Sequence, residues 1–298
     1  MSTQSQWIQL FRDRKAIDPV RVPDDAQQRL AALSGIRAVV FDVYGTLISS
    51  GVGDISLASE QDRDQSIKAT FIEQGFQLGP SAQDVAFDEF LYAAIKAAQA
   101  ERKAEGVTYP EVDIRKVWAT TRHNLEEAGH ISGGSDCDID TLAIDYESRV
   151  NPTQAMPGLQ ETLSALQERR LAMSIISNAQ FYTPYLFNAF AGNSLPTLGF
   201  SMDCSVWSYQ QLEGKPSTRL YEIAAEQLLT HLGIQAHEAL YVGNDQRNDI
   251  WPAQQIGFKT ALFAGDHRSL RRRKDDPNYA DILADLEITD LRQILDCI

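Results

Sequence analysis

A run of four apolar residues at positions 38–41 is followed directly by Asp42, and Gly45 lies three residues further on. A continuous apolar run is typical of a parallel strand that is covered on both faces of a sheet. In an open α/β sheet, ligands bind beyond the carboxyl ends of such strands. Gly45 permits a tight turn there, so the carboxylate of Asp42 is predicted to lie at a site of chemistry. The alternative is that Asp42 only shapes the turn.

The second half of the chain alternates between short apolar runs and segments with helical periodicity. Strands are expected at residues 171–176, 239–242, 259–263 and 286–289, and helices at 159–169 and 216–229. Strands that alternate with helices indicate right-handed crossover connections and a mostly parallel sheet. We therefore predict an α/β fold with a doubly wound, mostly parallel, Rossmann-like sheet.

A stretch of different character separates the first strand from the others. From about residue 50 to residue 149, apolar residues such as Phe87 and Leu91 recur at helical spacing. The predicted organisation is an N-terminal extension at 1–35 with a short amphipathic helix, a sheet domain at 36–49 and 150–298, and a helical insert at 50–149. Within the insert, residues 109–111 and Trp118 are candidates to line a crevice, although packing explains them as well.

Composition narrows the range of partners. The 298 residues carry a formal net charge of −14, which argues against nucleic acid or an anionic membrane as a partner. No segment reaches the roughly 20 apolar residues that a membrane span needs. Residues 1–11 lack a signal-peptide core, and three scattered cysteines fit a reducing compartment. We expect a cytoplasmic monomer or homodimer that acts on a small molecule.

One basic cluster stands out from this acidic composition. Residues 268–274 read RSLRRRK, and two aspartates and a proline follow at 275–277. An anionic substrate would have to be attracted by local positive charge or by a metal. We nevertheless interpret this cluster as a solvated surface rather than a phosphate or partner site, because acidic residues follow it at once.

Four polar segments follow predicted strands or precede predicted helices. They are Asp42 with Thr46, Ser177 with Asn178, residues 214–217 around Lys215, and residues 243–249. Strand ends of a doubly wound sheet converge on one edge, so these segments are expected to face one crevice.

Each of these residue types suits the transfer of one chemical group. A carboxylate can attack phosphorus or carbon and form a covalent ester. A serine hydroxyl can hold the oxygens of the transferred group, and a lysine ammonium neutralises charge. The clustered carboxylates Asp245 and Asp249 suit Mg²⁺, which prefers oxygen ligands; alternatively, they cap the helix that follows.

The order of these segments resembles the haloacid dehalogenase-like hydrolase superfamily, over residues 36–49 and about 150–265. The insert at 50–149 stands where that family has its cap. The resemblance implies that Asp42 is the nucleophile, Thr46 supports the first turn, Ser177 binds the transferred group, and Lys215 steadies nucleophile and substrate. It also implies a metal site formed by Asp42, the main-chain carbonyl of Tyr44, Asp245 and Asp249. We predict that Tyr44, Ser177 and Asn178 contact the substrate.

Two positions depart from the family's phosphatase pattern. Phosphatases of the family usually have a second aspartate, the general acid and base, where this chain has Tyr44. General acid–base catalysis contributes about 10²–10⁴-fold, and a tyrosine with a pKa near 10 is a poor substitute. Tyr44 is typical instead of the family's 2-haloacid dehalogenases, whose halide leaves without a proton and which need no metal. The second departure is Asn244, which stands where the family has a metal-binding aspartate. Either Asn244 coordinates weakly through its amide oxygen, or Asp245 takes the ligand role through a shifted turn; we favour Asp245.

Three functions follow from these observations. The leading hypothesis is a Mg²⁺-dependent phosphatase that acts on a small phosphate monoester through an aspartyl phosphate at Asp42. The missing acid is either unnecessary, for a substrate with a good leaving group, or supplied by the insert. The second is hydrolysis of the carbon–halogen bond of a 2-haloacid, which Tyr44 favours. The third is a binding or regulatory protein on the same fold with weak or no turnover, which Tyr44 and Asn244 favour.

Overall fold

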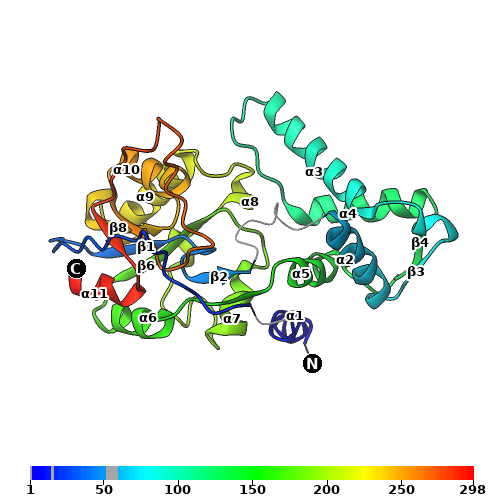
Figure 1. The fold of residues 1–298 in the computed structure, drawn as a ribbon, viewed down its shortest axis with the longest axis horizontal. Coiled ribbons are helices and arrows are strands. Elements are labelled where there is room, and N and C mark those ends of the chain that lie inside the picture. The colour runs from blue at the N-terminus through cyan, green and yellow to red at the C-terminus, as the bar shows by residue number, and fades with distance from the viewer. Residues whose placement is uncertain (1, 15–16, 52–59) are drawn as a thin grey trace.

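A parallel sheet of six strands forms the centre of the part of the chain that carries the predicted strands (Figure 1). The computed structural model describes residues 2–14, 17–51 and 60–298; residues 1 and 15–16 of the predicted extension and 52–59 of the predicted insert lie outside the described residues. The strand order is β10-β9-β8-β1-β6-β7, and every neighbouring pair in this sheet is parallel. The predicted α/β class and mostly parallel sheet are confirmed.

The strand boundaries agree closely with the predicted apolar runs. The strands are β1 Ala38–Phe41, β6 Ala172–Ser177, β7 Val206–Trp207, β8 Ala239–Gly243, β9 Lys259–Phe263 and β10 Leu286–Ile288. The sequence did not predict β7, because two residues are too few to show periodicity. Since β1 is central and is flanked by β6 and β8, the chain reverses its direction of winding at β1, which is where α/β sheets bind ligands.

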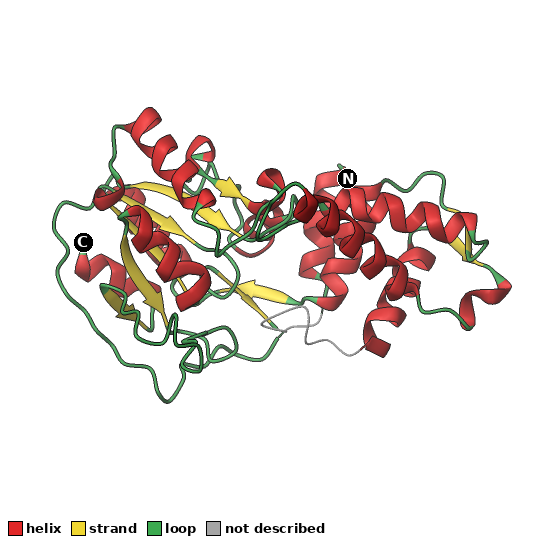
Figure 2. Cartoon of the chain, turned by 90° about the horizontal axis from the view of Figure 1, so that it is seen from above, coloured by secondary structure: helices red, strands yellow, loops and turns green. Residues whose placement is uncertain are grey.

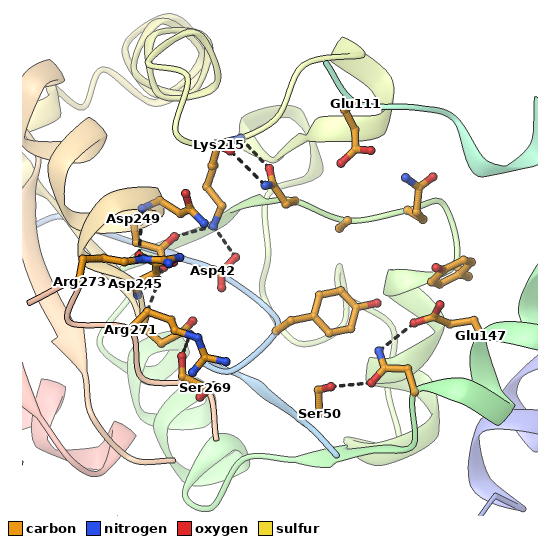
Figure 3. A pocket seen from close by; sticks show the side chains of 18 residues that line it. Asp42, Ser50, Glu111, Glu147, Lys215, Asp245, Asp249, Ser269, Arg271 and Arg273 are labelled. Carbon is orange, nitrogen blue, oxygen red and sulfur yellow. Dashed lines mark hydrogen bonds and ion pairs between the residues drawn. The ribbon is translucent and has the colours of Figure 1, made fainter. Parts of the chain in front are cut away.

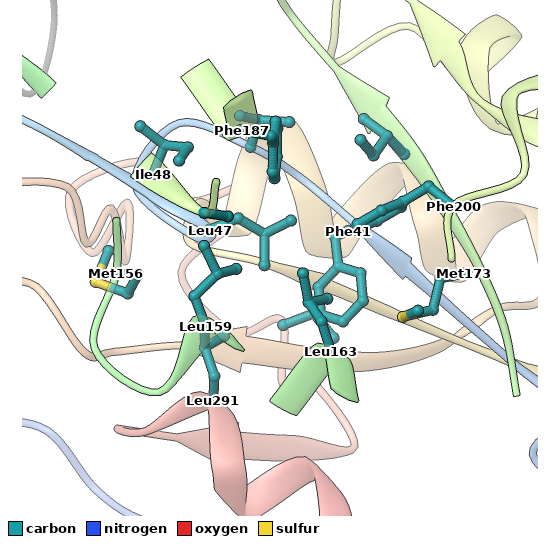
Figure 4. Packing of buried hydrophobic residues seen from close by; sticks show 14 of the residues in the cluster. Phe41, Leu47, Ile48, Met156, Leu159, Leu163, Met173, Phe187, Phe200 and Leu291 are labelled. Carbon is teal, nitrogen blue, oxygen red and sulfur yellow. The ribbon is translucent and has the colours of Figure 1, made fainter. Parts of the chain in front are cut away.

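Alternate residues of β1 face two separate hydrophobic cores. Val39 and Phe41 pack in one core with α6 Leu159–Glu168 and α7 Thr183–Phe190, and α11 Ile294–Cys297 closes it (Figure 4). Ala38 and Val40 face the other core, with α9 Arg219–Leu232 and α10 Trp251–Ile256. Helices therefore cover both faces, and this burial explains the continuous apolar character of the strands.

A group of helices lies beside the sheet and has a hydrophobic core of its own (Figures 1 and 2). Its members are α2 Glu60–Glu73, α3 Phe87–Ala104, α4 Ile114–Glu127 and α5 Ile139–Val150, with an antiparallel ribbon of β3 Phe76–Leu78 and β4 Ile131–Gly133. Trp118 is fully buried in this core, so packing explains it. A second ribbon, β2 Ile48–Ser50 with β5 Thr153–Ala155, joins the helices to the sheet. The division into domains at the predicted boundaries stays a prediction.

The N-terminal helix α1, Thr3–Arg12, contacts both the helical group and the sheet part. Trp7 is buried, donates a hydrogen bond of 2.9 Å from Nε1 to Thr141 Oγ1 in α5, and packs edge-on against Tyr185 of α7. Arg12 Nε donates to the carbonyl of Ala189 over 2.9 Å, beside the end of α7. Across the described ranges, none of the helices has the length and apolar character needed to cross a membrane.

Candidate active site

A pocket of about 380 Å³ opens at the carboxyl ends of β1, β6 and β8 (Figure 3). All four predicted polar segments contribute to its surroundings, as does the helical group. The residues that line it are Asp42, Tyr44, Ser50, Glu111, Glu147, Asn151, Asn178, Ala179, Gln180, Tyr182, Lys215, Asn244, Asp245, Asn248, Asp249, Ser269, Arg271 and Arg273. Strand-end convergence thus brings together groups that are up to about two hundred residues apart in the sequence.

The side chain of Asp42 is only 7 % exposed, and its carboxylate is held through one of its oxygens. Ser177 Oγ donates to Asp42 Oδ1 over 2.9 Å, and Lys215 Nζ donates to the same oxygen over 2.7 Å. Within the described chain, Asp42 Oδ2 has no hydrogen-bond donor. One oxygen therefore fixes the orientation of the side chain, and the other is available to a reacting group.

Two sets of contacts hold the loop that carries Lys215. The Lys215 N–H donates to Asn178 Oδ1 over 2.7 Å, so the predicted substrate-binding Asn178 also positions this loop. From the helical group, the Tyr109 carbonyl accepts a hydrogen bond of 2.8 Å from the Gly214 N–H, and the Glu111 N–H donates to the Leu212 carbonyl over 3.2 Å. The placement of Lys215 therefore depends on both parts of the chain.

Asp249 is buried and makes four hydrogen bonds. Its Oδ1 accepts from Lys215 Nζ at 2.5 Å and from the Tyr241 hydroxyl at 2.9 Å, and its Oδ2 accepts from the N–H groups of Asn244 and Asp245 at 3.0 and 2.9 Å. Burial raises the pKa of Asp249 to about 6, although the Lys215 charge opposes this. Burial alone would lower the pKa of Lys215, but Asp249 and Asp42 outweigh it and raise that pKa above its usual value.

Glycine is required at position 243 by the close approach of Asp249. A Cβ at Gly243 would lie 2.5 Å from both Cβ and Cγ of Asp249, a distance that real Cβ atoms do not adopt. The end of β8 and the carboxylate behind Lys215 thus fit together only because residue 243 lacks a side chain.

The carboxylate of Asp245 shares none of the hydrogen-bond donors that hold Asp42. Its Oδ1 accepts from the N–H groups of Arg247 and Asn248 at the start of the π-helical turn Gln246–Ile250. Arg273 donates to both of its oxygens, over 3.0 Å from Nε and 2.5 Å from Nη2. The capping alternative describes the helix contacts of Asp245, and the remaining capacity of this carboxylate is taken by Arg273.

Asn244 joins the first turn to a later loop. Its Oδ1 accepts from Thr46 Oγ1 over 3.1 Å, and its Nδ2 donates to the Ser269 carbonyl over 2.6 Å. Ser269 Oγ in turn donates to the Gly45 carbonyl over 3.2 Å. Gly45 has a φ of +82°, and a Cβ there would lie 2.6 Å from Ser269 Cβ, so glycine is needed for both its conformation and this contact. Thr46 therefore supports the turn through Asn244.

The interpretation of residues 268–274 as a solvated surface is wrong for its arginines: Arg268 and Arg272 pair with the buried Asp266 and Glu287, and the other two line the pocket. Arg271 and Arg273 line the pocket (Figure 3). The segment pairs with the loop after β8, since the Arg271 N–H donates to the Asn244 carbonyl and the Arg271 carbonyl accepts from the Gln246 N–H, each over 2.9 Å. The sequence did contain a signal for this placement. The cluster follows β9 by a few residues, so it begins at the same carboxyl edge of the sheet as the predicted site.

The donors predicted for Mg²⁺ do not fit that ion as they are arranged. In the described part of the chain, no three His, Cys, Asp or Glu side chains are grouped so as to hold a metal. Both oxygens of Asp249 and both oxygens of Asp245 already accept hydrogen bonds from protein groups. Mg²⁺ demands octahedral oxygen ligands, and among the carboxylates predicted to bind it, within the described ranges, only Asp42 Oδ2 lacks a hydrogen-bond donor. We therefore derive no chemical step through a metal.

Groups on the opposite side of the pocket come from the helical part and from Tyr44. Burial and the Glu147 charge raise the pKa of the Tyr44 phenol well above its usual value, and its hydroxyl lies 3.1 Å from Thr183 Oγ1. Glu147 accepts a hydrogen bond of 2.8 Å from Asn151 Nδ2, and burial raises the pKa of its carboxyl group. Burial also raises the pKa of Glu111. Both glutamates face the pocket across from Asp42 (Figure 3), and sequence reasoning anticipated an acid in the insert without identifying it.

Comparison with known proteins gives one family and several relatives. The family model of haloacid dehalogenase-like hydrolases matches residues 36–257. The chain is 23% identical to the ribulose-1,5-bisphosphate 5-phosphatase of Halopiger xanaduensis, over 78% of this chain and 91% of that protein. It is 22% identical to the phospholysine phosphohistidine inorganic pyrophosphate phosphatase of Mus musculus, over 89% of this chain and 94% of that protein.

One solved structure supports the fold. The 2-haloacid dehalogenase from Pseudomonas syringae pv. Tomato DC3000 superposes with a TM-score of 0.56 and 21% identity, over 88% of this chain and 97% of that chain. At this identity the likeness concerns the arrangement of the backbone only. The predicted family resemblance and the predicted fold class are thereby confirmed.

Proposed function

Because the chain belongs to the haloacid dehalogenase-like hydrolase family, we propose that it is a phosphatase that hydrolyses a small phosphate monoester through Asp42. The observation that carries this proposal is the arrangement of Asp42, whose Oδ1 accepts from both Ser177 and Lys215. A nucleophile needs one oxygen fixed and the other free to approach phosphorus in line. The similarity to two phosphatases supports a phosphate ester, rather than a 2-haloacid, as the substrate.

The proposed first step transfers the phosphoryl group to the enzyme. Asp42 Oδ2 forms a bond to phosphorus while the bond between phosphorus and the ester oxygen breaks, and that oxygen departs with the electron pair. We infer that Glu147 donates the proton to the departing oxygen, since its buried carboxyl group has a raised pKa and is available as an acid. The Ser177 hydroxyl keeps its proton on Asp42 Oδ1, and the Lys215 ammonium offsets the negative charge beside the transferred group.

The proposed second step returns the enzyme to its starting state. A water molecule attacks the phosphorus of the aspartyl phosphate, the bond to Asp42 breaks, and inorganic phosphate leaves. The proton of that water passes to Glu147, which restores the acid. The intact contacts of Asp42 favour catalysis over the binding-only alternative.

Several further predictions from the sequence play no part in the two proposed chemical steps. The predicted Mg²⁺ dependence is not part of this proposal, because the described donors do not fit that ion. A small-molecule substrate, a cytoplasmic location, and a monomeric or homodimeric state are retained as proposals. Tyr44 favours a second candidate, hydrolysis of a 2-haloacid, because a halide leaves without a proton.

The test is release of phosphate from a panel of phosphate monoesters by the purified chain and by Asp42→Asn. Activity should fall by at least about 10³-fold in Asp42→Asn, because the nucleophile is removed. Asp275→Asn, which removes an exposed carboxylate, is the matched control and should keep full activity. Halide release from 2-chloropropionate, without phosphate release from any ester, would replace the phosphatase proposal with the dehalogenase one.

A further inference from the structure

Among the described residues, charge pairing in the pocket gives Arg271 no anionic partner. Lys215 contacts the carboxylates of Asp42 and Asp249, and Arg273 contacts that of Asp245. Within the described ranges, no carboxylate lies within ion-pair distance of Arg271. Its Nη1 instead donates to the carbonyls of Arg268 and Leu270, over 2.7 and 3.1 Å. These two bonds fix the side chain while its positive charge stays uncompensated.

The position of Arg271 makes this charge relevant to the substrate. Its guanidinium lines the same pocket as Asp42, on the side that Asp245 and Asp249 occupy (Figure 3). Both the N–H and the carbonyl group of Arg271 are hydrogen-bonded to the loop after β8, at Asn244 and Gln246. A half-buried guanidinium on a fixed backbone is a preorganised donor for the oxygens of a phosphoryl group.

Arg273 adds to this arrangement from the next turn of the same segment. It holds Asp245 with a two-point contact, and its own backbone has a φ of 53°, in the left-handed region. The contact neutralises the carboxylate that would otherwise repel an anion beside Arg271.

We propose that Arg271, supported by Arg273, supplies the positive charge that binds the phosphoryl anion, so that this chain binds the anion without a divalent cation. The proposal rests on the proposed function, since it assigns the phosphoryl group to this pocket. Two observations carry it together: the carboxylates expected to hold Mg²⁺ already accept bonds from Lys215 and Arg273, and an unpaired guanidinium faces the same pocket. The fixed guanidinium also gives the planar geometry that phosphate oxygens match.

The test is calorimetric titration of inorganic phosphate into the purified chain under two conditions. One contains excess EDTA, and the other contains Mg²⁺ and no EDTA. The wild-type chain should bind phosphate in EDTA, and Mg²⁺ should tighten binding by no more than about twofold. Arg271→Gln should weaken binding by at least about tenfold, as expected for loss of a charge-assisted hydrogen bond. Arg271→Lys should fall between the two, because an ammonium lacks the planar fork.

Lys274→Gln is the matched control, because it removes one positive charge from the same segment. Its ammonium pairs with exposed Asp25 at 2.8 Å, and phosphate affinity should stay within about twofold of wild type. Thermal unfolding of each variant establishes that it is folded, and the EDTA titration of the wild-type chain decides the metal question without any variant. Phosphate binding that requires Mg²⁺, or unchanged affinity in folded Arg271→Gln, would overturn the proposal.

The outcomes separate this inference from the proposed function. Phosphate release that requires Mg²⁺ and is normal in Arg271→Gln would leave the phosphatase standing and remove the arginine site. Conversely, arginine-dependent phosphate binding in EDTA without hydrolysis of any ester would keep the arginine site and remove the phosphatase.

Discussion

At the scale of single residues, one oxygen of Asp42 receives two donors and Asp249 receives four. Lys215 contacts both carboxylates, so it positions Asp42, the proposed nucleophile, relative to the fixed carboxylate of Asp249. Buried charges are tolerated only where such partners satisfy them. Glu147 contrasts with this group because burial raises the pKa of its carboxyl group without a cation beside it.

Glu147→Gln should lower kcat for alkyl phosphates by about 10²-fold, because their alkoxide needs a proton as it leaves. For p-nitrophenyl phosphate, whose leaving group needs no proton, the decrease should be less than about fivefold. Because the acid must be protonated, kcat of the wild-type chain should fall as pH rises through the raised pKa of Glu147, and the variant should lose that fall. Initial rates across a pH series measure both effects; equal losses on the two substrates would exclude this role.

Glu111→Gln is the comparison for that experiment. Glu111 also faces the pocket and has a raised pKa, but it accepts hydrogen bonds from Ser208 Oγ and from the Val112 N–H. We expect Glu111→Gln to change substrate binding rather than the dependence on the leaving group.

At the scale of elements, α1 contacts two helices that lie far from it in the sequence. It packs on α5 through Trp7 and Thr141, and on α7 through Trp7 and Tyr185. Arg14, just after α1, also forms an ion pair with the buried carboxylate of Asp145 in α5. A short N-terminal helix thus connects the helical group with the sheet part.

Trp7→Ala should lower the free energy of unfolding by about 3 kcal/mol or more, because it removes a large buried side chain. It should also raise amide hydrogen exchange in both α5 and α7, since Trp7 contacts both. Gln6→Ala, at an exposed position of the same helix, is the control and should change stability by less than about 0.5 kcal/mol. Urea unfolding and exchange mass spectrometry provide the two measurements. Faster exchange in only one of the two helices would contradict the bridging role.

The sequence was sufficient for elements whose signal is local. The strands β8 and β9 and the helix α6 follow from apolar runs and helical spacing, and their predicted boundaries agree to within one residue. Ser177 and Lys215 were placed correctly beside Asp42 because strand ends must meet at one edge. The contacts of Asp245 were not predictable, because they involve Arg273, which lies 28 positions away in a loop without periodicity. Pairings of this kind depend on how a loop folds back, and no window of residues encodes that.

At the scale of the whole molecule, the net charge of −14 opposes the approach of an anionic substrate. The pocket counters it at short range through Arg271, because Lys215 and Arg273 already pair with carboxylates. The Debye length falls from about 30 Å at 0.01 M salt to about 10 Å at 0.1 M, so added salt screens the distant charges more than the half-buried ones.

KM for a phosphate monoester should therefore fall by a factor of about two to five as ionic strength rises from roughly 10 to 100 mM. Steady-state kinetics in sodium chloride measures this effect, and potassium acetate, as the control, should give the same curve. A KM that rises from the lowest salt onward would mean that local attraction dominates at every distance.

The bonds from Tyr109 and Glu111 to the Leu212–Gly214 peptide groups, immediately before Lys215, have a mechanical consequence. If the helices swing outward to admit a substrate, these bonds must stretch or break, and the ammonium beside Asp42 would lose its alignment. Substrate entry and activation of Asp42 would then be coupled. The enzyme would be inactive while it is open, and Asp42 would be correctly oriented only after the helices have closed.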